Sequence, residues 1–193
     1  MNNKKYFLTS GRLGFGHWSN EDFELAYKLW GNFEVTKFID ARGRLSEEQI
    51  QERLNKEIET NNKYGIQYWP MFLLSSDEFI GCCGLRPYDL PKYIYEAGVH
   101  ILPDFWGNGF ATEAIQTVMK YGFTILNAKA LFAGHNPKNE TSRCLLLKSG
   151  FSYTHNEFYP PTGLHHPSYL ITLDEYNRDA NREMGTGTRV ARK

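Results

Sequence analysis

Two glycines just past the middle of the chain carry the clearest chemical signal in the sequence. They lie in segment 106–111 (Trp-Gly-Asn-Gly-Phe-Ala), which connects a strand-like run at 93–102 to an amphipathic helical run at 111–126. Glycine lets the backbone turn its N–H groups toward one point and lets a ligand approach closely. The first turn of a helix adds unpaired N–H donors and the positive end of the helix dipole. The segment therefore predicts a phosphate-binding turn, although an ordinary strand-to-helix turn can also hold two glycines.

Two well-known phosphate-binding motifs do not fit this segment. A P-loop ends in Gly-Lys-Ser/Thr, which is absent here. A dinucleotide fingerprint needs three spaced glycines after a first strand and an acidic residue further along the chain. Binding of a nucleotide phosphate through the same turn stays open as an alternative, and the ligand that stabilises the protein would distinguish the two.

The elements that must position this turn follow from hydrophobic periodicity and capping residues. The predicted order is β-α-α-β-β-β-α-β-α-β-β. Strands are predicted at residues 5–16, 68–74, 79–85, 93–102, 130–134, 151–159 and 168–173. Helices are predicted after the capping residues Ser19 and Ser46, at 111–126, and from Asn139 to Gly150. Residues 31–39, 86–92 and 160–167 are predicted to be connectors or loops.

Composition places the chain among single-domain globular proteins. Its 193 residues are 41% hydrophobic and 15% aromatic, so one core is feasible, and we expect a domain at 1–176 and a disordered tail at 177–193. The formal net charge is zero, which gives no electrostatic case for a nucleic-acid or membrane partner. Three cysteines provide neither a disulfide framework nor zinc-ligand spacing. We therefore expect a cytoplasmic protein without a metal site.

The glycine turn resembles the CoA pyrophosphate loop of the GNAT acetyltransferases, with Trp106 in place of the usual Gln or Arg. The form Trp-Gly-x-Gly-Phe-Ala-Thr-Glu-Ala is similar to that of the ribosomal-protein (Rim-type) N-acetyltransferase subgroup. Segments 80–85, 96–99, 136–142 and 148–151 also resemble that subgroup, in order and at its spacing. The resemblance covers about residues 6–176. It implies an α/β (α+β) GNAT fold: a mixed, mostly antiparallel sheet of about six to seven strands with helices on both faces.

The same resemblance implies acetyl-CoA as cosubstrate. Backbone N–H groups of the turn would hold the pyrophosphate; they belong to Gly107, Asn108, Gly109, Phe110, Ala111 and Thr112. The main chain of Val99, His100 and Ile101 would pair with the pantetheine, and an N–H near Ile101 would stabilise the oxyanion of the thioester carbonyl. Asn139 would contact the cofactor through its side chain, although helix capping alone also explains an Asn there.

Catalysis needs a base for the ammonium and an acid for the leaving thiolate. In many GNAT enzymes a Glu lies five residues before the Asn and a Tyr seven residues after it. These positions are Gly134 and Leu146, and neither can transfer a proton. The candidate base is therefore Glu96 and the candidate acid is Ser142.

Both candidates have plainer explanations. Strand alternation places Glu96, Gly98 and His100 on one face, where an apolar surrounding would raise the pKa of the carboxyl group. A glutamate at a strand edge can equally serve in an ion pair. Ser142 lies in a helical turn, where a serine hydroxyl often bonds to its own backbone.

Four further residues flank the predicted acceptor side. His165 and His166 are adjacent, so their side chains should point apart and make a poor metal pair. Tyr159 and Tyr169 flank the same loop and either line an acceptor pocket or belong to the core.

The sequence thus predicts an acetyl-CoA-dependent N-acetyltransferase that acts by direct transfer in a ternary complex. The acceptor would be a protein N-terminus or a small amine such as a polyamine, amino acid or aminoglycoside, and the enzyme a monomer or homodimer. The alternative is a catalytically weak or inactive CoA-binding module of the same fold, which Gly134 and Leu146 favour.

Overall fold

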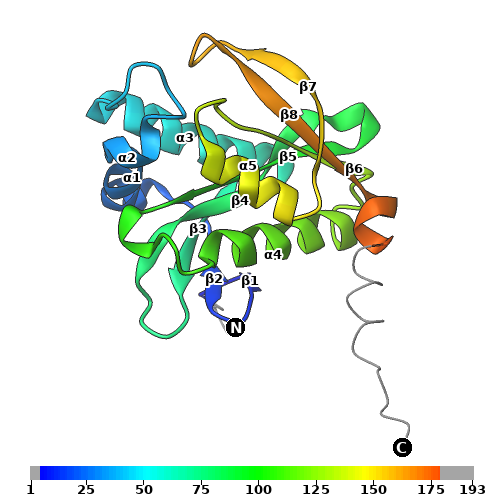
Figure 1. Cartoon of the computed structure of the whole chain (residues 1–193). Coiled ribbons are helices and arrows are strands. Elements are labelled where there is room, and N and C mark those ends of the chain that lie inside the picture. Colours follow the sequence, from blue (N-terminus) through cyan, green and yellow to red (C-terminus); the bar gives the residue numbers. More distant parts are fainter. Residues whose placement is uncertain (1–4, 179–193) are drawn as a thin grey trace, which may run out of the picture.

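The computed structural model describes residues 5–178, and its centre is a mixed sheet of eight strands (Figure 1). The strand order is β1-β2-β3-β4-β5-β6-β8-β7, and every neighbouring pair is antiparallel except β5 and β6. The strands are β1 (Leu8–Thr9), β2 (Leu13–Phe15), β3 (Tyr68–Leu73), β4 (Phe79–Asp89), β5 (Ile94–Ile101), β6 (Ala130–Gly134), β7 (Ser152–Tyr159) and β8 (Leu164–Thr172). The predicted α/β fold with a mostly antiparallel sheet is confirmed.

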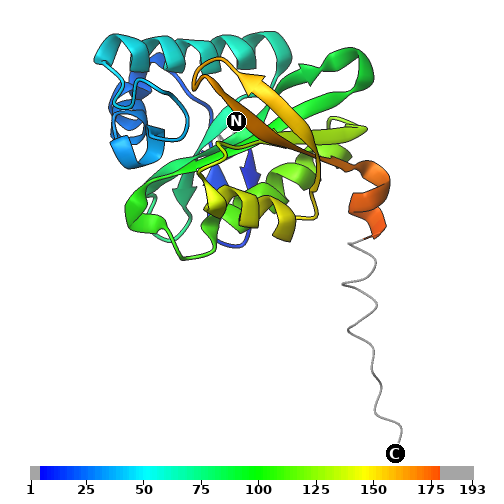
Figure 2. The same ribbon diagram turned by 45° about the horizontal axis from the view of Figure 1, so that its top comes forward.

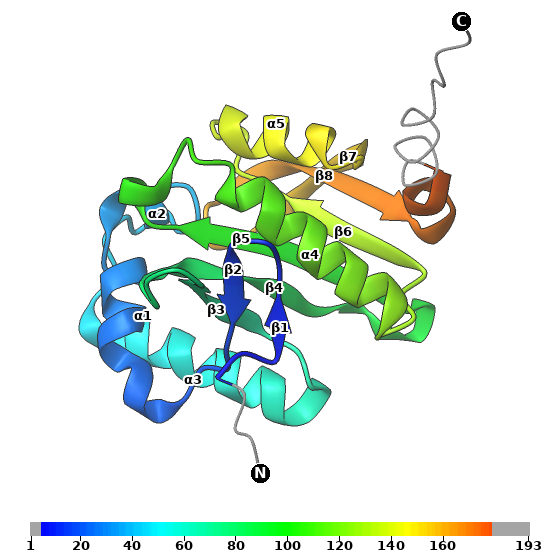
Figure 3. The ribbon, with the colours of Figure 1, turned by 90° about the horizontal axis from the view of Figure 1, so that it is seen from below.

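Helices cover both faces of the sheet, as predicted. The helices are α1 (Phe23–Trp30), α2 (Phe33–Thr36), α3 (Glu47–Tyr64), α4 (Phe110–Thr124) and α5 (Glu140–Lys148), with 3-10 turns at Asn20–Asp22, Leu90–Lys92 and Pro103–Phe105. Helix α3 lies over one face together with α1 and α2 (Figure 2). Helices α4 and α5 lie over the opposite face (Figure 3). In the described part of the chain, no helix is both long and apolar enough to cross a membrane.

Two hydrophobic clusters occupy the two faces of the sheet. The cluster under α4 includes Leu13, Ile101 and Leu131, which come from both halves of the sheet. The cluster under α3 includes Trp30 and Leu54. The alternation of side chains along each strand divides the chain between these clusters. The site is therefore built on a sheet that is supported on both sides.

Four sequence expectations change in detail. The single strand predicted at 5–16 is a hairpin of β1 and β2, which raises the strand number to eight. Strand β4 continues to Asp89 through the predicted loop, and Pro87 is tolerated because pairing with β3 ends at Gly84. Strand β8 begins at Leu164, so half of the predicted loop 160–167 is strand. Helix α2 forms within the predicted connector 31–39.

The predicted tail at 177–193 lies, apart from its first two residues, outside the described part of the chain. Residues 173–178 are helical, so the strand predicted to reach 173 gives way to a helix at that residue. The single domain predicted at 1–176 stays a prediction.

Candidate active site

The sheet opens between β5 and β6. These two parallel strands share only three residue pairs, from Ile94–Ala130 to Glu96–Phe132. Beyond Glu96 the edge of β5 that faces β6 has no strand partner. The structure therefore leaves a row of backbone groups available on one side of a central strand.

The backbone groups at this open edge can be assigned from the ladder on the other side of β5. The N–H of Leu102, just after β5, donates to Ile80 O of β4 at 2.9 Å. Because hydrogen-bonding directions alternate along an antiparallel strand, the N–H of His100 also faces β4, whereas those of Val99 and Ile101 face the opening. Of the three residues predicted to contact pantetheine, Val99 and Ile101 thus direct their N–H groups toward the opening between β5 and β6. His100 does not.

Trp106 marks one end of the open edge. Its indole N–H donates to the carbonyl oxygen of Ile101 at 2.7 Å, and about half of its side chain is exposed. The residue that replaces the usual Gln or Arg therefore fixes the glycine turn to the end of β5.

The glycine turn has the backbone conformation that glycine favours. Gly107 and Gly109 both have φ of 77°, in the left-handed region, and Gly109 is the N-cap of α4. A Cβ atom added at Gly107 would meet nothing within 4 Å. The N–H groups of Phe110, Ala111 and Thr112 lie in the first helical turn, where the helix itself supplies no acceptor. These donors and the space beside them fit a diphosphate.

A carboxylate holds the first turn of α4 against the β1–β2 hairpin. Glu113 accepts hydrogen bonds from Ser10 Oγ at 2.7 Å and from Arg12 N and Nε at 2.8 and 2.6 Å. The Arg12 guanidinium also donates to Asn108 O at 3.1 Å and lies 4.4 Å from the centre of the Phe110 ring. The conformation of the turn is thereby tied to the start of the chain. Arg12, which is hydrogen-bonded to Glu113, also adds a positive charge beside the N-terminus of α4, and a helix N-terminus already favours anions.

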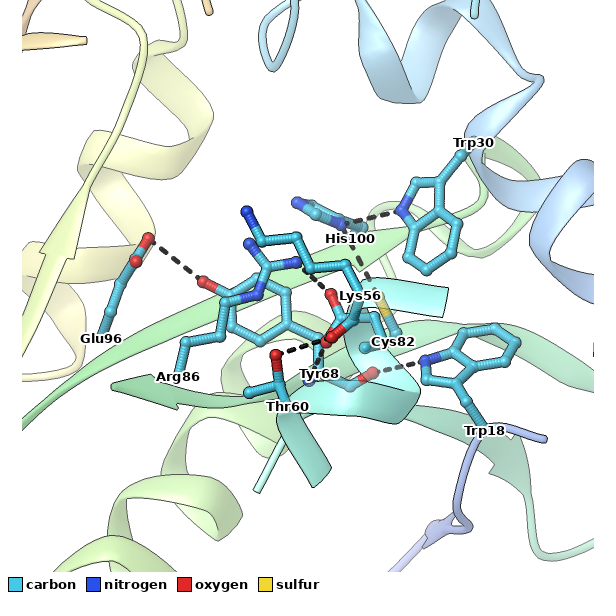
Figure 4. Close-up of polar contacts among 10 residues, drawn as sticks. Trp18, Trp30, Lys56, Thr60, Tyr68, Cys82, Arg86, Glu96 and His100 are labelled. Carbon is cyan, nitrogen blue, oxygen red and sulfur yellow. Dashed lines mark hydrogen bonds and ion pairs between the residues drawn. The ribbon is translucent and has the colours of Figure 1, made fainter. Parts of the chain in front are cut away.

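Glu96 lies at the last residue pair before the sheet opens, on the α3 face. Its carboxylate accepts a hydrogen bond from Tyr68 Oη at 3.2 Å (Figure 4). Burial raises the pKa of Glu96 above its usual value, whereas the charge of Arg86 and the hydrogen bond from Tyr68 lower it. A carboxylate with a raised pKa at this position is suited to take a proton from an ammonium group.

Further polar side chains join Glu96 on this face (Figure 4). Glu57 of α3 is 1% exposed; it forms an ion pair with Arg86 and accepts from the Tyr68 N–H at 2.9 Å. The Arg86 guanidinium lies 4.0 Å from the centre of the Tyr68 ring. Arg86 therefore connects the buried Glu57 carboxylate to the tyrosine that contacts Glu96.

His100 closes the same face at the far end of β5. Its Nδ1 lies 3.3 Å from the indole nitrogen of Trp30, which donates to it. Burial, followed by the charges of Arg53 and Arg86, lowers the pKa of His100 well below its usual value. A neutral imidazole that accepts at Nδ1 agrees with this lowered pKa. Glu96, Gly98 and His100 share one face, as strand alternation predicts; the Tyr68 hydroxyl occupies the position of the missing Gly98 side chain.

The start of α5 holds the remaining predicted residues. Asn139 is the N-cap, and its Oδ1 accepts from the Ser142 N–H at 3.1 Å. This capping contact leaves the Asn139 amide nitrogen able to donate to a ligand. Leu146 is buried in the α4-side cluster, and Gly134 ends β6. Neither provides a proton, so a catalytic acid would have to come from another residue such as Ser142.

The residues flanking the β7–β8 turn separate as their spacing suggests. His165 is exposed beside Phe158, whereas His166 is 8% exposed and its Nε2 lies 2.7 Å from Thr162 Oγ1. Among residues 5–178 no cluster of three or more His, Cys, Asp or Glu could hold a metal ion. Tyr169 is a core residue at 3% exposure, and Tyr159 is partly exposed.

A separate hollow of about 370 Å³ lies beside α5, and none of its lining residues belongs to β5. It is lined by His135, Pro137, Glu140, Arg143, Leu147, Tyr153, Pro167 and Tyr169. It includes neither the glycine turn nor Glu96, so the strand geometry defines the candidate site better than this hollow does.

Comparison with known proteins agrees with this geometry. Residues 12–152 match the model described as Acetyltransferase (GNAT) domain. The Bacillus subtilis protein named Uncharacterized N-acetyltransferase YoaA is 32% identical over 149 residues, which cover 75% of this chain and 81% of that protein. The fold and the site therefore define an acyltransferase. Because the family match spans more than half of the chain, this chain belongs to the GNAT acetyltransferases.

Solved structures share the fold at lower identity. A spermidine N-acetyltransferase from Vibrio cholerae, in complex with CoA and spermine, has a TM-score of 0.73 at 20% identity, covering 87% of this chain and 99% of its own. A putative ribosomal-protein-serine acetyltransferase from Vibrio cholerae has a TM-score of 0.73 at 14% identity, with coverage of 86% and 96%. These likenesses establish the fold and leave the acceptor open.

Sequence reasoning missed the α3 side of the site. Ile50 and Leu54 define the buried face of that helix, and Glu57 follows seven residues after Ile50 on the same face. A charged residue in an apolar stripe was the available signal, because buried charges need partners. Its partner Arg86 lay in a segment predicted to be a loop.

Proposed function

We propose that the chain transfers an acetyl group from acetyl-CoA to a primary amine, with both substrates bound together. The observation that carries this proposal is the open edge of β5. At one end of this edge is the glycine turn, which is suited to a diphosphate, and on the opposite face is the carboxylate of Glu96. A cosubstrate and an acceptor could therefore meet at one strand from two sides, which is the alignment that direct transfer needs.

The proposed cosubstrate contacts are mostly backbone groups. The N–H donors of residues 107–112 would hold the diphosphate, and the outward N–H groups of Val99 and Ile101 would pair with the pantetheine as an added strand would. His100 would contribute backbone position only, since its N–H faces β4. The Asn139 amide nitrogen would add a side-chain donor. When bound, acetyl-CoA supplies the activated acetyl group.

The proposed transfer forms a carbon–nitrogen bond and breaks the carbon–sulfur bond. The ammonium nitrogen loses two protons in all: the second leaves after the attack and replaces the proton given to the thiolate, and the first leaves before the attack. Glu96 would accept this proton because burial raises its pKa. The Ile101 N–H would donate to the carbonyl oxygen, and Ser142 is the proposed proton donor to the departing thiolate.

The acceptor class has two sources of support at this level. The glycine turn resembles that of the ribosomal-protein subgroup, which supports a protein N-terminal amine. The neighbours of similar fold also include a spermidine N-acetyltransferase, which acts on a small amine by its name. We therefore propose a primary amine.

Thermal unfolding and thiol release test the proposal together. We expect acetyl-CoA to raise the melting temperature, since a ligand that binds only the folded state stabilises it, whereas ATP and NAD should not. Thiol release from acetyl-CoA should then depend on an added amine, in a panel of peptides, amino acids, polyamines and aminoglycosides.

Two results would contradict the proposal in different ways. Equal stabilisation by ATP would show that the turn binds nucleotide phosphates in general. Stabilisation by acetyl-CoA without amine-dependent thiol release would indicate a module that binds CoA without catalysing transfer.

A further inference from the structure

Arg53 of α3 is a cation without an anionic partner in the described part of the chain. Its guanidinium lies 5.0 Å from the centre of the Trp30 ring. Its Nε is buried and forms no hydrogen bond with any of residues 5–178, and no ion pair among those residues includes it. A buried N–H of a guanidinium normally has a partner, because the loss of its hydration is costly.

The other charged groups near Arg53 compensate each other. Arg86 is paired with Glu57, and Arg42 is paired with Asp40 through two hydrogen bonds of 2.8 and 2.5 Å. His100 is kept neutral by its lowered pKa. Of these three guanidinium groups, Arg53 is therefore the one that forms no ion pair with a carboxylate among residues 5–178.

The position of Arg53 relates it to the proposed acceptor side. Trp30, on which it stacks, donates to His100, and His100 shares the α3 face of β5 with Glu96. Tyr159 of β7 is close enough to both Glu96 and Arg53 for their charges to act on its hydroxyl: besides burial, which raises the pKa of Tyr159, the charge of Glu96 raises this pKa and that of Arg53 lowers it. The turn after β7 also reaches this side, where Pro161 O accepts from the Ala41 N–H at 2.9 Å. The cosubstrate would lie on the side of the glycine turn, so the acceptor would enter the α3 face that Arg53 borders.

We propose that Arg53 binds a carboxylate of the acceptor, so that the acceptor is a small molecule with both a primary amine and a carboxylate, as in amino acids. This inference rests on the proposed function. The planar guanidinium presents a fork of donors that matches a carboxylate in geometry and charge. A polyamine would bring a second cation toward Arg53, and the nearby Glu57 and Asp40 carboxylates are already paired with Arg86 and Arg42. The acceptor amine would then be directed toward Glu96 while its carboxylate stays at Arg53.

Matched pairs of acceptors test the proposal directly. Lysine and cadaverine differ by one carboxylate, as do phenylalanine and phenethylamine. For the wild-type enzyme we expect kcat/KM to be about tenfold or more higher for the amino acid, because a site that binds a polar group discriminates against the analogue without it. Aminoalkyl phosphonates form a third arm, which separates a carboxylate from another anion.

Arg53→Met should remove this preference, and Lys63→Met is the matched control. Lys63 is an exposed cation on the same helix. We expect the ratio of kcat/KM values within each pair to fall about tenfold or more in Arg53→Met and to stay unchanged in Lys63→Met. Calorimetry with the N-acetylated products gives a readout without turnover: wild type should bind N-acetyl-phenylalanine more tightly than N-acetyl-phenethylamine, and Arg53→Met should not.

The outcomes separate this proposal from the proposed function. Equal kcat/KM within the pairs, or a preference that survives in Arg53→Met, would overturn the role of Arg53 while acetyl transfer itself stands. A preference for phosphonates would overturn the carboxylate assignment. Absence of transfer to every amine would contradict the proposed function, and the product-binding comparison would still decide on Arg53. If Arg53→Met does not fold, Arg53→Lys keeps the charge without the fork and should lose part of the preference.

Discussion

The buried ion pair between Glu57 and Arg86 allows a quantitative test of the site's construction. Glu57 is 1% exposed and the Arg86 side chain 22% exposed, so each charge depends on the other for its stability. Two neutral replacements, Glu57→Gln and Arg86→Met, each leave one charge without its partner. The Gln side chain can still accept from the Tyr68 N–H, which confines the change in Glu57→Gln to the ion pair.

The magnitudes follow from this geometry. Breaking a buried pair by removing one partner costs about 3–5 kcal/mol, because the remaining charge is buried and unpaired. The double variant leaves neither charge, so its loss should be no more than about 2 kcal/mol, mainly from the missing hydrogen bonds. For a chain of this size each kcal/mol corresponds to about 2–4 °C in melting temperature. Each single variant should therefore melt about 6–20 °C below wild type, and the double variant above both.

Urea unfolding followed by tryptophan fluorescence measures the cycle. Trp30 and Trp69 are fully buried and report on the cores at the two faces of the sheet. An unchanged dependence of the unfolding free energy on urea would show that each variant still unfolds in the same two-state manner. Additive losses, with the double variant as unstable as the sum of the singles, would refute the coupling of these two charges.

Two further predictions concern catalysis and cosubstrate binding. Glu96→Gln should lower turnover about 10²- to 10⁴-fold at neutral pH. The raised pKa of Glu96 also means that its basic form is lost as pH falls through that raised value, so the acid limb of the wild-type pH–rate profile should lie above the usual glutamate range. The same raised pKa favours the neutral carboxyl in the folded state, so the stability that Glu96 contributes is present below its unfolded pKa and lost as pH rises through the folded pKa. Glu96→Gln should therefore not destabilise the protein at neutral pH. Parallel pH–rate profiles of variant and wild type would remove Glu96 from the mechanism. Gly109→Ala and Gly107→Ala should each lower the unfolding free energy by about 1–2 kcal/mol, the cost of a left-handed conformation for alanine, and should weaken acetyl-CoA binding in calorimetry. Gly65→Ala, at φ 70° with nothing within 4 Å of the added Cβ, should cost similar stability without changing that affinity, and an equal loss of affinity in Gly65→Ala would show a general effect of stability.

Features that local residues determine could be predicted from the sequence. Ser46 and Gln49 form the predicted capping box at the start of α3, since both partners lie within one turn. Gly107 and Gly109 adopt the left-handed conformation that makes the turn before α4. Side-chain alternation along β5 was predictable for the same reason, because it depends only on the strand period.

Features that depend on distant partners could not be predicted. The extension of β4 to Asp89 is determined by pairing with β5, and the sequence there contains a proline that normally indicates a loop. The association of Arg53, Glu57 and Arg86 depends on how α3 lies over the sheet, which helix periodicity does not specify. Of the candidate site, the glycine turn and Glu96 were therefore accessible from sequence, and the charged residues around the acceptor side were not.

The separation of β5 from β6 has a consequence for amide hydrogen exchange. Along one strand, His100 and Leu102 direct their N–H groups into the ladder with β4, whereas Val99 and Ile101 direct theirs toward the opening. Amides in a ladder exchange only when the structure opens, while amides without a partner exchange from the native state. Protection in this strand should therefore alternate from residue to residue. A ligand that pairs with the open edge as an added strand would make the protection continuous along β5. The amides of Val99 and Ile101 would therefore report binding without an attached probe.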